Sequence, residues 1–123
     1  MKILIVEPDK MVRQFFVKVL EDAGHQVVLA GNGEGALFAL QGQKDIELII
    51  SDVYLSDMCN YELARKVRED DPRKKLLLIL DWPYEETVEN EAYSAGFGGI
   101  LCKPVKAEDL IRMVRTLVRT LVI

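Results

Sequence analysis

Acidic residues and one lysine stand at the ends of short apolar runs in this sequence, in the order Glu7, Asp9, Asp52, Asp81 and Lys103. Residues of these types can carry out phosphoryl chemistry. A carboxylate accepts the phosphoryl group, a divalent cation held by acidic oxygens spreads the developing charge, and a lysine contacts a phosphoryl oxygen. Each residue alone is typical of a solvated loop. Their combination predicts a site if the fold brings them together.

The apolar runs before these residues indicate parallel strands, because they are rich in β-branched residues and alternate with segments of helical period. The predicted strands are residues 3–6, 26–30, 46–51, 76–80 and 99–102, and the predicted helices are residues 10–23, 33–40, 61–69, 85–95 and 107 to about 122. We expect residues 46–51 to form the central strand, buried on both faces. Ligands of such sheets gather outside the carboxyl ends of the strands, where the acidic residues and the lysine stand.

Composition restricts the class of protein. The chain has 123 residues, of which 50% are hydrophobic and 29% are charged, a balance that predicts a single globular domain over residues 1–123. A net charge of −4 argues against a nucleic-acid surface, and no apolar run is long enough to span a membrane. Without a signal-peptide pattern we expect a cytoplasmic location, and Cys59 and Cys102 are expected to be reduced thiols.

The sequence resembles the response-regulator receiver family of two-component signalling over its whole length. The segments that carry the similarity are Ile3–Glu7, Gly33–Leu37, Asp45–Asp52, Ala95–Gly99 and Cys102–Pro104. The resemblance implies a doubly wound, flavodoxin-like α/β fold with five parallel strands in the order 2-1-3-4-5, and a cis peptide bond before Pro104. It also implies a signalling module that receives a phosphoryl group from a histidine kinase or a phosphotransfer protein, and not an enzyme in its own right.

The resemblance assigns roles to the residues at the strand ends. Asp52 falls on the phosphoacceptor position and Lys103 on the lysine that contacts the phosphate. Mg²⁺ would be held by Glu7, Asp52 and the backbone carbonyl of Tyr54, and Asp9 is a further candidate ligand.

Four positions depart from the family pattern. Pro8 replaces the second acidic residue after the first strand, which is a direct metal ligand in the family. Asp81, followed by Trp82, replaces a hydroxyl residue that would hydrogen-bond the phosphoryl group, and Ile100 replaces the aromatic switch residue. Residues 55–60 also differ from the usual Met-Pro-x-Met-Asp-Gly loop. We therefore expect weak Mg²⁺ binding and impaired phosphorylation and switching.

Other functions fit parts of the sequence. A receiver fold could serve as an interaction module without phosphorylation. Gly31–Ala36 matches a dinucleotide-binding fingerprint, with Asp52 roughly 20 residues further on, although the chain lacks the second half that a dinucleotide needs. A flavodoxin is disfavoured because the loop after the first strand, Glu7–Lys10, is acidic and contains no glycine.

Two regions are candidates for partner contacts. The first is the segment that contains Trp82, Tyr84, Phe97 and Ile100, for which ordinary packing is the competing interpretation. The second is the last helix, where a second apolar stripe is broader than one sheet face needs; its members are Ile111, Val118 and Val122. An output protein, an output domain of a longer parent chain or a homodimer could cover these faces.

Overall fold

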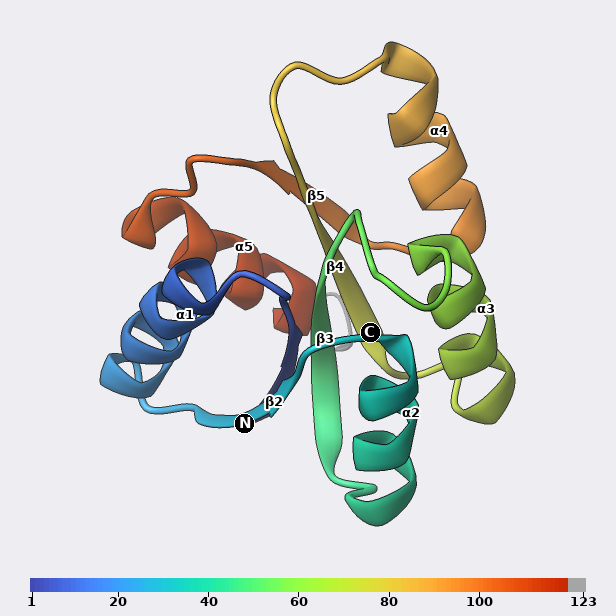
Figure 1. Ribbon diagram of the computed structural model, residues 1–123. Coiled ribbons are helices and arrows are strands. Elements are labelled where there is room, and N and C mark those ends of the chain that lie inside the picture. Colours follow the sequence, from blue (N-terminus) through green and yellow to red (C-terminus); the bar gives the residue numbers. More distant parts are fainter. Residues whose placement is uncertain (120–123) are drawn as a thin grey trace.

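The computed structural model describes residues 1–119 and shows a five-stranded parallel sheet between two layers of helices (Figure 1). The elements are β1 (Lys2–Val6), α1 (Lys10–Asp22), β2 (Gln26–Ala30), α2 (Gly33–Gly42), β3 (Ile46–Asp52), α3 (Asn60–Asp70), β4 (Lys75–Leu80), α4 (Glu86–Ala95), β5 (Gly99–Cys102) and α5 (Ala107–Arg119). The strand order is β2-β1-β3-β4-β5, so the predicted fold class is confirmed. No described helix is long and apolar enough to cross a membrane.

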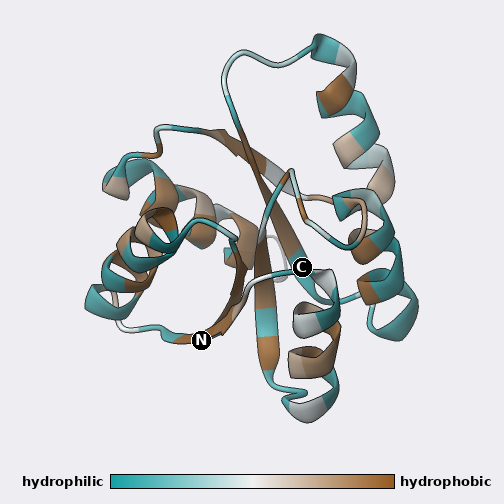
Figure 2. Ribbon diagram, in the orientation of Figure 1, coloured by the Kyte–Doolittle hydropathy of each residue, from teal (hydrophilic) through white to brown (hydrophobic). Residues whose placement is uncertain are grey.

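The sheet separates two hydrophobic cores because successive side chains of a strand point to opposite faces. On β1, Ile3 and Ile5 pack with α1 and α5, whereas Leu4 and Val6 pack with α2, α3 and α4. The helices carry their apolar stripes toward these cores and their polar residues toward solvent (Figure 2). Both faces of the central strands are therefore covered, and only the strand ends are free to present polar groups.

The prediction of a fully buried central strand is correct for β3 except at Glu47, which is exposed. Lys2 pairs with Ile46 and Ile3 pairs with Leu48, so the register between β1 and β3 shifts at this point. The shift leaves Glu47 without a partner residue on β1, and its side chain stays in solvent. From Leu48 to Asp52 the strand is buried throughout.

Most element boundaries agree with the sequence prediction to within one or two residues. Asp9 caps α1, since its side chain accepts hydrogen bonds from the backbone N–H groups of Met11 and Val12. Helix α4 ends at Gly96, which adopts the left-handed conformation with a φ of +113°. The predicted end of the last helix, near Val122, lies outside the described residues.

Gly96, which follows α4, and Gly42, the last residue of α2, allow a matched test of this fold. We expect Gly96→Ala to lower the free energy of unfolding by about 1–2 kcal/mol, because a side chain is strained at positive φ. Gly42→Ala should be neutral or raise it by up to about 1 kcal/mol, because no atom lies within 4 Å of the added Cβ and alanine favours helix. Urea unfolding of both variants tests the pair, and equal effects would contradict the assignment.

Candidate functional site

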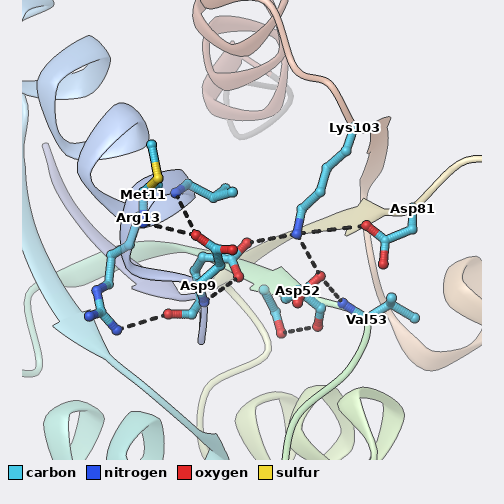
Figure 3. A network of polar contacts seen from close by, with 10 residues as sticks. Asp9, Met11, Arg13, Asp52, Val53, Asp81 and Lys103 are labelled. Atoms are coloured by element: carbon cyan, nitrogen blue, oxygen red, sulfur yellow. Dashed lines mark hydrogen bonds and ion pairs between the residues drawn. The ribbon is translucent and has the colours of Figure 1, made fainter.

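The polar residues at the carboxyl edge of the sheet meet at the Lys103 side chain (Figure 3). Lys103 Nζ lies 3.1 Å from Glu7 Oε1, 3.4 Å from Asp52 Oδ1 and 3.8 Å from Asp81 Oδ1. These residues follow or end β1, β3, β4 and β5. They lie at the carboxyl ends of the strands, where ligands of parallel sheets are expected to bind. The structure therefore brings together four of the five residues singled out from the sequence.

The three carboxylates differ in their access to water. Glu7 and Asp52 are buried, with 1% and 7% of their surface exposed, whereas the Asp81 side chain is 52% exposed. The second oxygen of Glu7 accepts a hydrogen bond from the backbone N–H of Asp9 at 3.0 Å. Asp52 accepts one from the N–H of Val53 at 2.9 Å. The site thus has a buried floor and a solvent-facing rim.

Burial and like charge govern the electrostatics of Asp52. Burial is the largest cause that raises the pKa of Asp52, and the Glu7 carboxylate is the next; Lys103 partly opposes them. The pKa of Lys103 is also raised, although burial acts on it with the opposite sign. Burial alone would lower it, but the contact with Glu7 and the charges of Asp52 and Asp81 together raise it. Lys103 is therefore held as a cation.

Side chains of the described residues do not by themselves supply the ligand set expected for Mg²⁺. Among residues 1–119 no group of three or more His, Cys, Asp or Glu side chains could hold a metal ion. Pro8 offers no side-chain oxygen, and the Asp9 carboxylate is engaged as the cap of α1. The Lys103 ammonium, and not an open position, lies beside the carboxylates of Glu7 and Asp52. The donor set is therefore a poor fit to the octahedral oxygen shell that Mg²⁺ requires.

Tyr54 and Pro104 complete the predicted site residues. The Tyr54 side chain is 71% exposed in the loop after β3, and the metal contact expected from its backbone carbonyl stays a prediction. The Lys103–Pro104 peptide bond is cis, as the resemblance implied. A second cis bond, Trp82–Pro83, was not anticipated.

Asp57 is a structural residue of the site region that sequence reasoning missed. Its two carboxylate oxygens accept hydrogen bonds from the backbone N–H groups of Gly33 and Glu34, at 2.9 and 2.8 Å, at the start of α2. These bonds lower the pKa of Asp57. Met58 packs so closely over Gly33 that a Cβ there would lie 2.4 Å from it. The loop after Asp52 is thereby attached to α2.

The Asp57 contact also bears on the dinucleotide alternative. In such sites a phosphate accepts hydrogen bonds from the N–H groups at the start of the helix that follows the glycine-rich turn. Here Asp57 accepts from Gly33 and Glu34, and the Asn32 side chain accepts from Gly35. The chain's own side chains fill the place of the phosphate, which argues against nucleotide binding.

The residues predicted to contact a partner have different environments. Phe97 is 3% exposed and belongs to the core, so packing is its role. Trp82 is 72% exposed, and Ile100 is half-buried. Tyr84 is also half-buried; its hydroxyl donates to Glu89 Oε1 at 2.5 Å, which raises its pKa to about 12. Of these four residues, only Trp82 offers a large exposed apolar surface.

The second apolar stripe of α5 is less free than the sequence suggested. Ile111 and Val118 are half-buried and pack against the core that α1 and α5 share. Val122 lies outside the described residues. Much of this stripe is thus explained by packing within the chain.

Comparison with known proteins identifies the family that has this geometry. The model of the response regulator receiver domain matches residues 3–115. The chain belongs to the response-regulator receiver family. It is 32% identical to the response regulator receiver protein CpdR of Brucella abortus over 110 residues, which cover 89% of this chain and 90% of CpdR. It is 34% identical to the transcriptional regulatory protein CusR of Escherichia coli, covering 97% of this chain and 52% of CusR.

Solved receiver structures have the same architecture. The chemotaxis protein CheY4 of Vibrio cholerae superposes with a TM-score of 0.87 at 28% identity, covering 94% of this chain and 97% of CheY4. A two-component response regulator of Clostridium difficile superposes with a TM-score of 0.91 at 27% identity, covering 100% and 99%. The receiver domain therefore acts in two-component phosphorelay signalling. Receiver domains as a family use Mg²⁺.

The raised pKa of Asp52 predicts how stability depends on pH. The folded receiver binds the Asp52 proton more tightly than the unfolded chain does, so ionisation of Asp52 lowers the free energy of unfolding as pH rises from its ordinary value of 3.8 through its raised value. We expect Asp52→Asn to raise the free energy of unfolding at neutral pH. The gain should disappear below about pH 3, where aspartate is protonated in both states.

Asp57→Asn is the matched control, because the pKa of Asp57 is lowered and the sign reverses. This variant should lose stability at neutral pH, and the loss should fade as pH falls through the lowered pKa. Urea unfolding at several pH values measures both effects. A stability loss for Asp52→Asn at neutral pH would show that Asp52 is not under electrostatic strain.

Proposed function

We propose that this receiver acts in its signalling pathway mainly by binding another protein. Asp52 is the phosphoacceptor, but only a small fraction of the protein becomes phosphorylated on it. The observation that carries the proposal is the arrangement of Glu7, Asp52 and Asp81 around one Lys103 ammonium. The lysine that would contact the phosphoryl group already has three carboxylate neighbours.

The Asp81 carboxylate shares the Lys103 ammonium with Asp52 and so adds negative charge near the place of a phosphoryl group. A phosphoryl group brings up to about two negative charges at neutral pH. Two unit charges about 6 Å apart repel by roughly 3 kcal/mol at an effective dielectric of about 20. A threonine or serine at this position would donate a hydrogen bond, whereas the Asp81 carboxylate repels. Because Asp81 is half-exposed, solvent and salt screen part of this repulsion, so it impairs phosphorylation and does not forbid it.

Glu7 competes with a phosphoryl group for contact with the Lys103 ammonium. A phosphoryl group on Asp52 would attract the Lys103 ammonium, which now lies 3.1 Å from the Glu7 carboxylate. Glu7 is almost wholly buried, and a buried charge that loses its partner is strongly unfavourable. A phosphoryl group on Asp52 would therefore lengthen the contact between Lys103 and Glu7, or Lys103 would have to contact both groups at once.

We also propose a cation, partners and a cellular location for this receiver. Mg²⁺ would be held weakly by Glu7, Asp52 and the Tyr54 carbonyl, where it would spread negative charge. A histidine kinase or phosphotransfer protein is the expected donor in the pathway. The 52% coverage of CusR supports an output domain in a longer parent chain as one arrangement, and a separate output protein or a homodimer as others. The setting that fits these partners is the cytoplasm.

Phosphorylation of Asp52 can be measured directly. After treatment with acetyl phosphate and Mg²⁺, intact-mass measurement should find little phosphorylated native protein. Asp81→Thr should increase the phosphorylated fraction several-fold, because it replaces repulsion with a hydrogen bond, and Asp81→Thr with Pro8→Asp should increase it further. Asp52→Asn is the control that must show no added mass. Near-complete phosphorylation of the native chain would overturn the proposal.

Metal affinity is a separate prediction. Trp82, the sole tryptophan, stands next to Asp81 and reports on the rim of the site. Titration with Mg²⁺ should change its fluorescence only at millimolar concentrations, and Pro8→Asp should tighten binding at least tenfold by restoring an oxygen ligand. Asp52→Asn again serves as the control. Micromolar affinity of the native protein that depends on Asp52 would contradict the prediction.

A further inference from the structure

The edge of the sheet at β2 is a surface that the site described above does not use (Figure 1). Among the described strands β2 pairs with β1 alone, so one side of its backbone has no partner strand. The N–H of Gln26 and the carbonyl of Ala30 form hydrogen bonds with the residues just before and just after β1. Because backbone groups of successive residues point to alternate sides of a strand, those of Val27 and Leu29 point away from β1. The edge therefore offers the N–H and C=O groups of these two residues to a further strand.

β2 has none of the features that usually protect an edge strand from pairing. Such strands are kept short or carry lysine, proline or a bulge. β2 has the sequence Gln-Val-Val-Leu-Ala, without charge or proline, and pairs with β1 in continuous register. The opposite edge strand, β5, has only four residues and is followed at once by Lys103 and Pro104. β2 is therefore the better suited of the two edges to pair with another strand.

The side chains beside the β2 edge leave room for another strand. A hollow of about 490 Å³ lies between α1 and Leu29 of β2. The Leu29 side chain is 50% exposed, and the half-buried Val17 of α1 lines the same hollow. The centre of the hollow is thus apolar and open to a side chain from outside.

The charges along this hollow differ between its two ends. Lys10 lies at the start of α1 and Glu21 near its end, and both are exposed and line the hollow. Because α1 connects two parallel strands, it runs in the direction opposite to β2, so Lys10 lies beside the end of β2 and Glu21 beside its beginning. Lys18 and Asp22, which also line the hollow, pair with each other at 3.2 Å. A partner whose charges run in the reverse order would match this surface.

We propose that β2 pairs with β2 of a second copy of this chain, antiparallel about a twofold axis at Val28, and joins the two five-stranded sheets into one. Val27 of each copy then lies opposite Leu29 of the other and exchanges two hydrogen bonds with it. The two α1 helices lie about two strand spacings apart, roughly 10 Å, which is a usual distance for packed helices.

The charge pattern favours a second copy over an unrelated segment. An antiparallel arrangement places Lys10 of each copy beside Glu21 of the other, so both ends of the hollow are matched at once. Twofold dimers require such a self-complementary surface. A purely acidic or purely basic segment would match one end and meet repulsion at the other. The pairing uses no residue of the Lys103 cluster, so it goes beyond the function proposed above and does not depend on it.

Analytical ultracentrifugation from micromolar to millimolar concentration tests the pairing. We expect a reversible monomer–dimer equilibrium in the native protein. Leu29→Lys should weaken the dimer by about tenfold or more, because a lysine on an edge strand opposes pairing. Lys10→Glu and Glu21→Lys should each weaken it, and the variant with both changes should regain the native affinity, because the ion pairs form again with reversed sign.

Cross-linking tests the register. Val28 of the two copies would lie opposite each other with Cα atoms roughly 4.5 Å apart, within reach of a disulfide bond. In a protein with Cys59→Ser and Cys102→Ser, we expect Val28→Cys to form a covalent dimer on oxidation with diamide. Leu29→Cys, although more exposed, should link far more slowly, because the two copies of residue 29 would be roughly 8 Å apart.

Tyr93→Lys is the matched control for Leu29→Lys, since Tyr93 is 53% exposed on α4, beside α3. It should leave the dimer unchanged, and thermal unfolding confirms that each variant is folded. A native protein that stays monomeric over the whole range would overturn the inference. So would a dimer that Leu29→Lys leaves intact or Tyr93→Lys abolishes, or faster linking of Leu29→Cys than of Val28→Cys. Phosphorylation of Asp52 in the intact-mass experiment bears only on the function proposed above, so the two proposals can fail separately.

Discussion

The ion-pair cluster around Lys103 is the interaction on which the rest of this site depends. The Glu7 side chain has almost no contact with water, and the Lys103 ammonium lies 3.1 Å from it. The same ammonium reaches Asp52 on β3 and Asp81 after β4. The Lys103 side chain, at the end of β5, thus links the carboxyl ends of β1, β3 and β4. It supplies the positive charge that the three carboxylates share.

This cluster explains why the departures from the family pattern belong together. With Pro8 in place of an acidic ligand, the site has fewer oxygens for a divalent cation, and Lys103 supplies the positive charge near Glu7 and Asp52. With a carboxylate at Asp81, the lysine gains another partner where a phosphoryl group would need a donor. In the proposed function, these substitutions favour the resting arrangement of the site over the phosphorylated one.

The sequence was sufficient to predict the features that depend on local pattern and on the rule for parallel sheets. The strands, their carboxyl-edge residues and the meeting of Glu7, Asp52 and Lys103 could be predicted in this way, while the strand order and the cis bond came from the resemblance. The capping of α2 by Asp57 could not be predicted, because the contact joins residues 24 positions apart. Any polar residue of a loop could have made the same hydrogen bonds. The exposure of Glu47 depends on a register shift between β1 and β3, which has no signal in either strand alone.

Asp81 is the most exposed carboxylate of the cluster, with 52% of its side chain in solvent, so charge brought to it from outside acts on the whole site. If a partner's cation pairs with Asp81, it reduces the negative charge that opposes a phosphoryl group on Asp52. By thermodynamic linkage, a phosphoryl group on Asp52 must then strengthen the binding of that partner by the same factor. In that case the carboxylate at position 81 shifts control of Asp52 toward the bound partner.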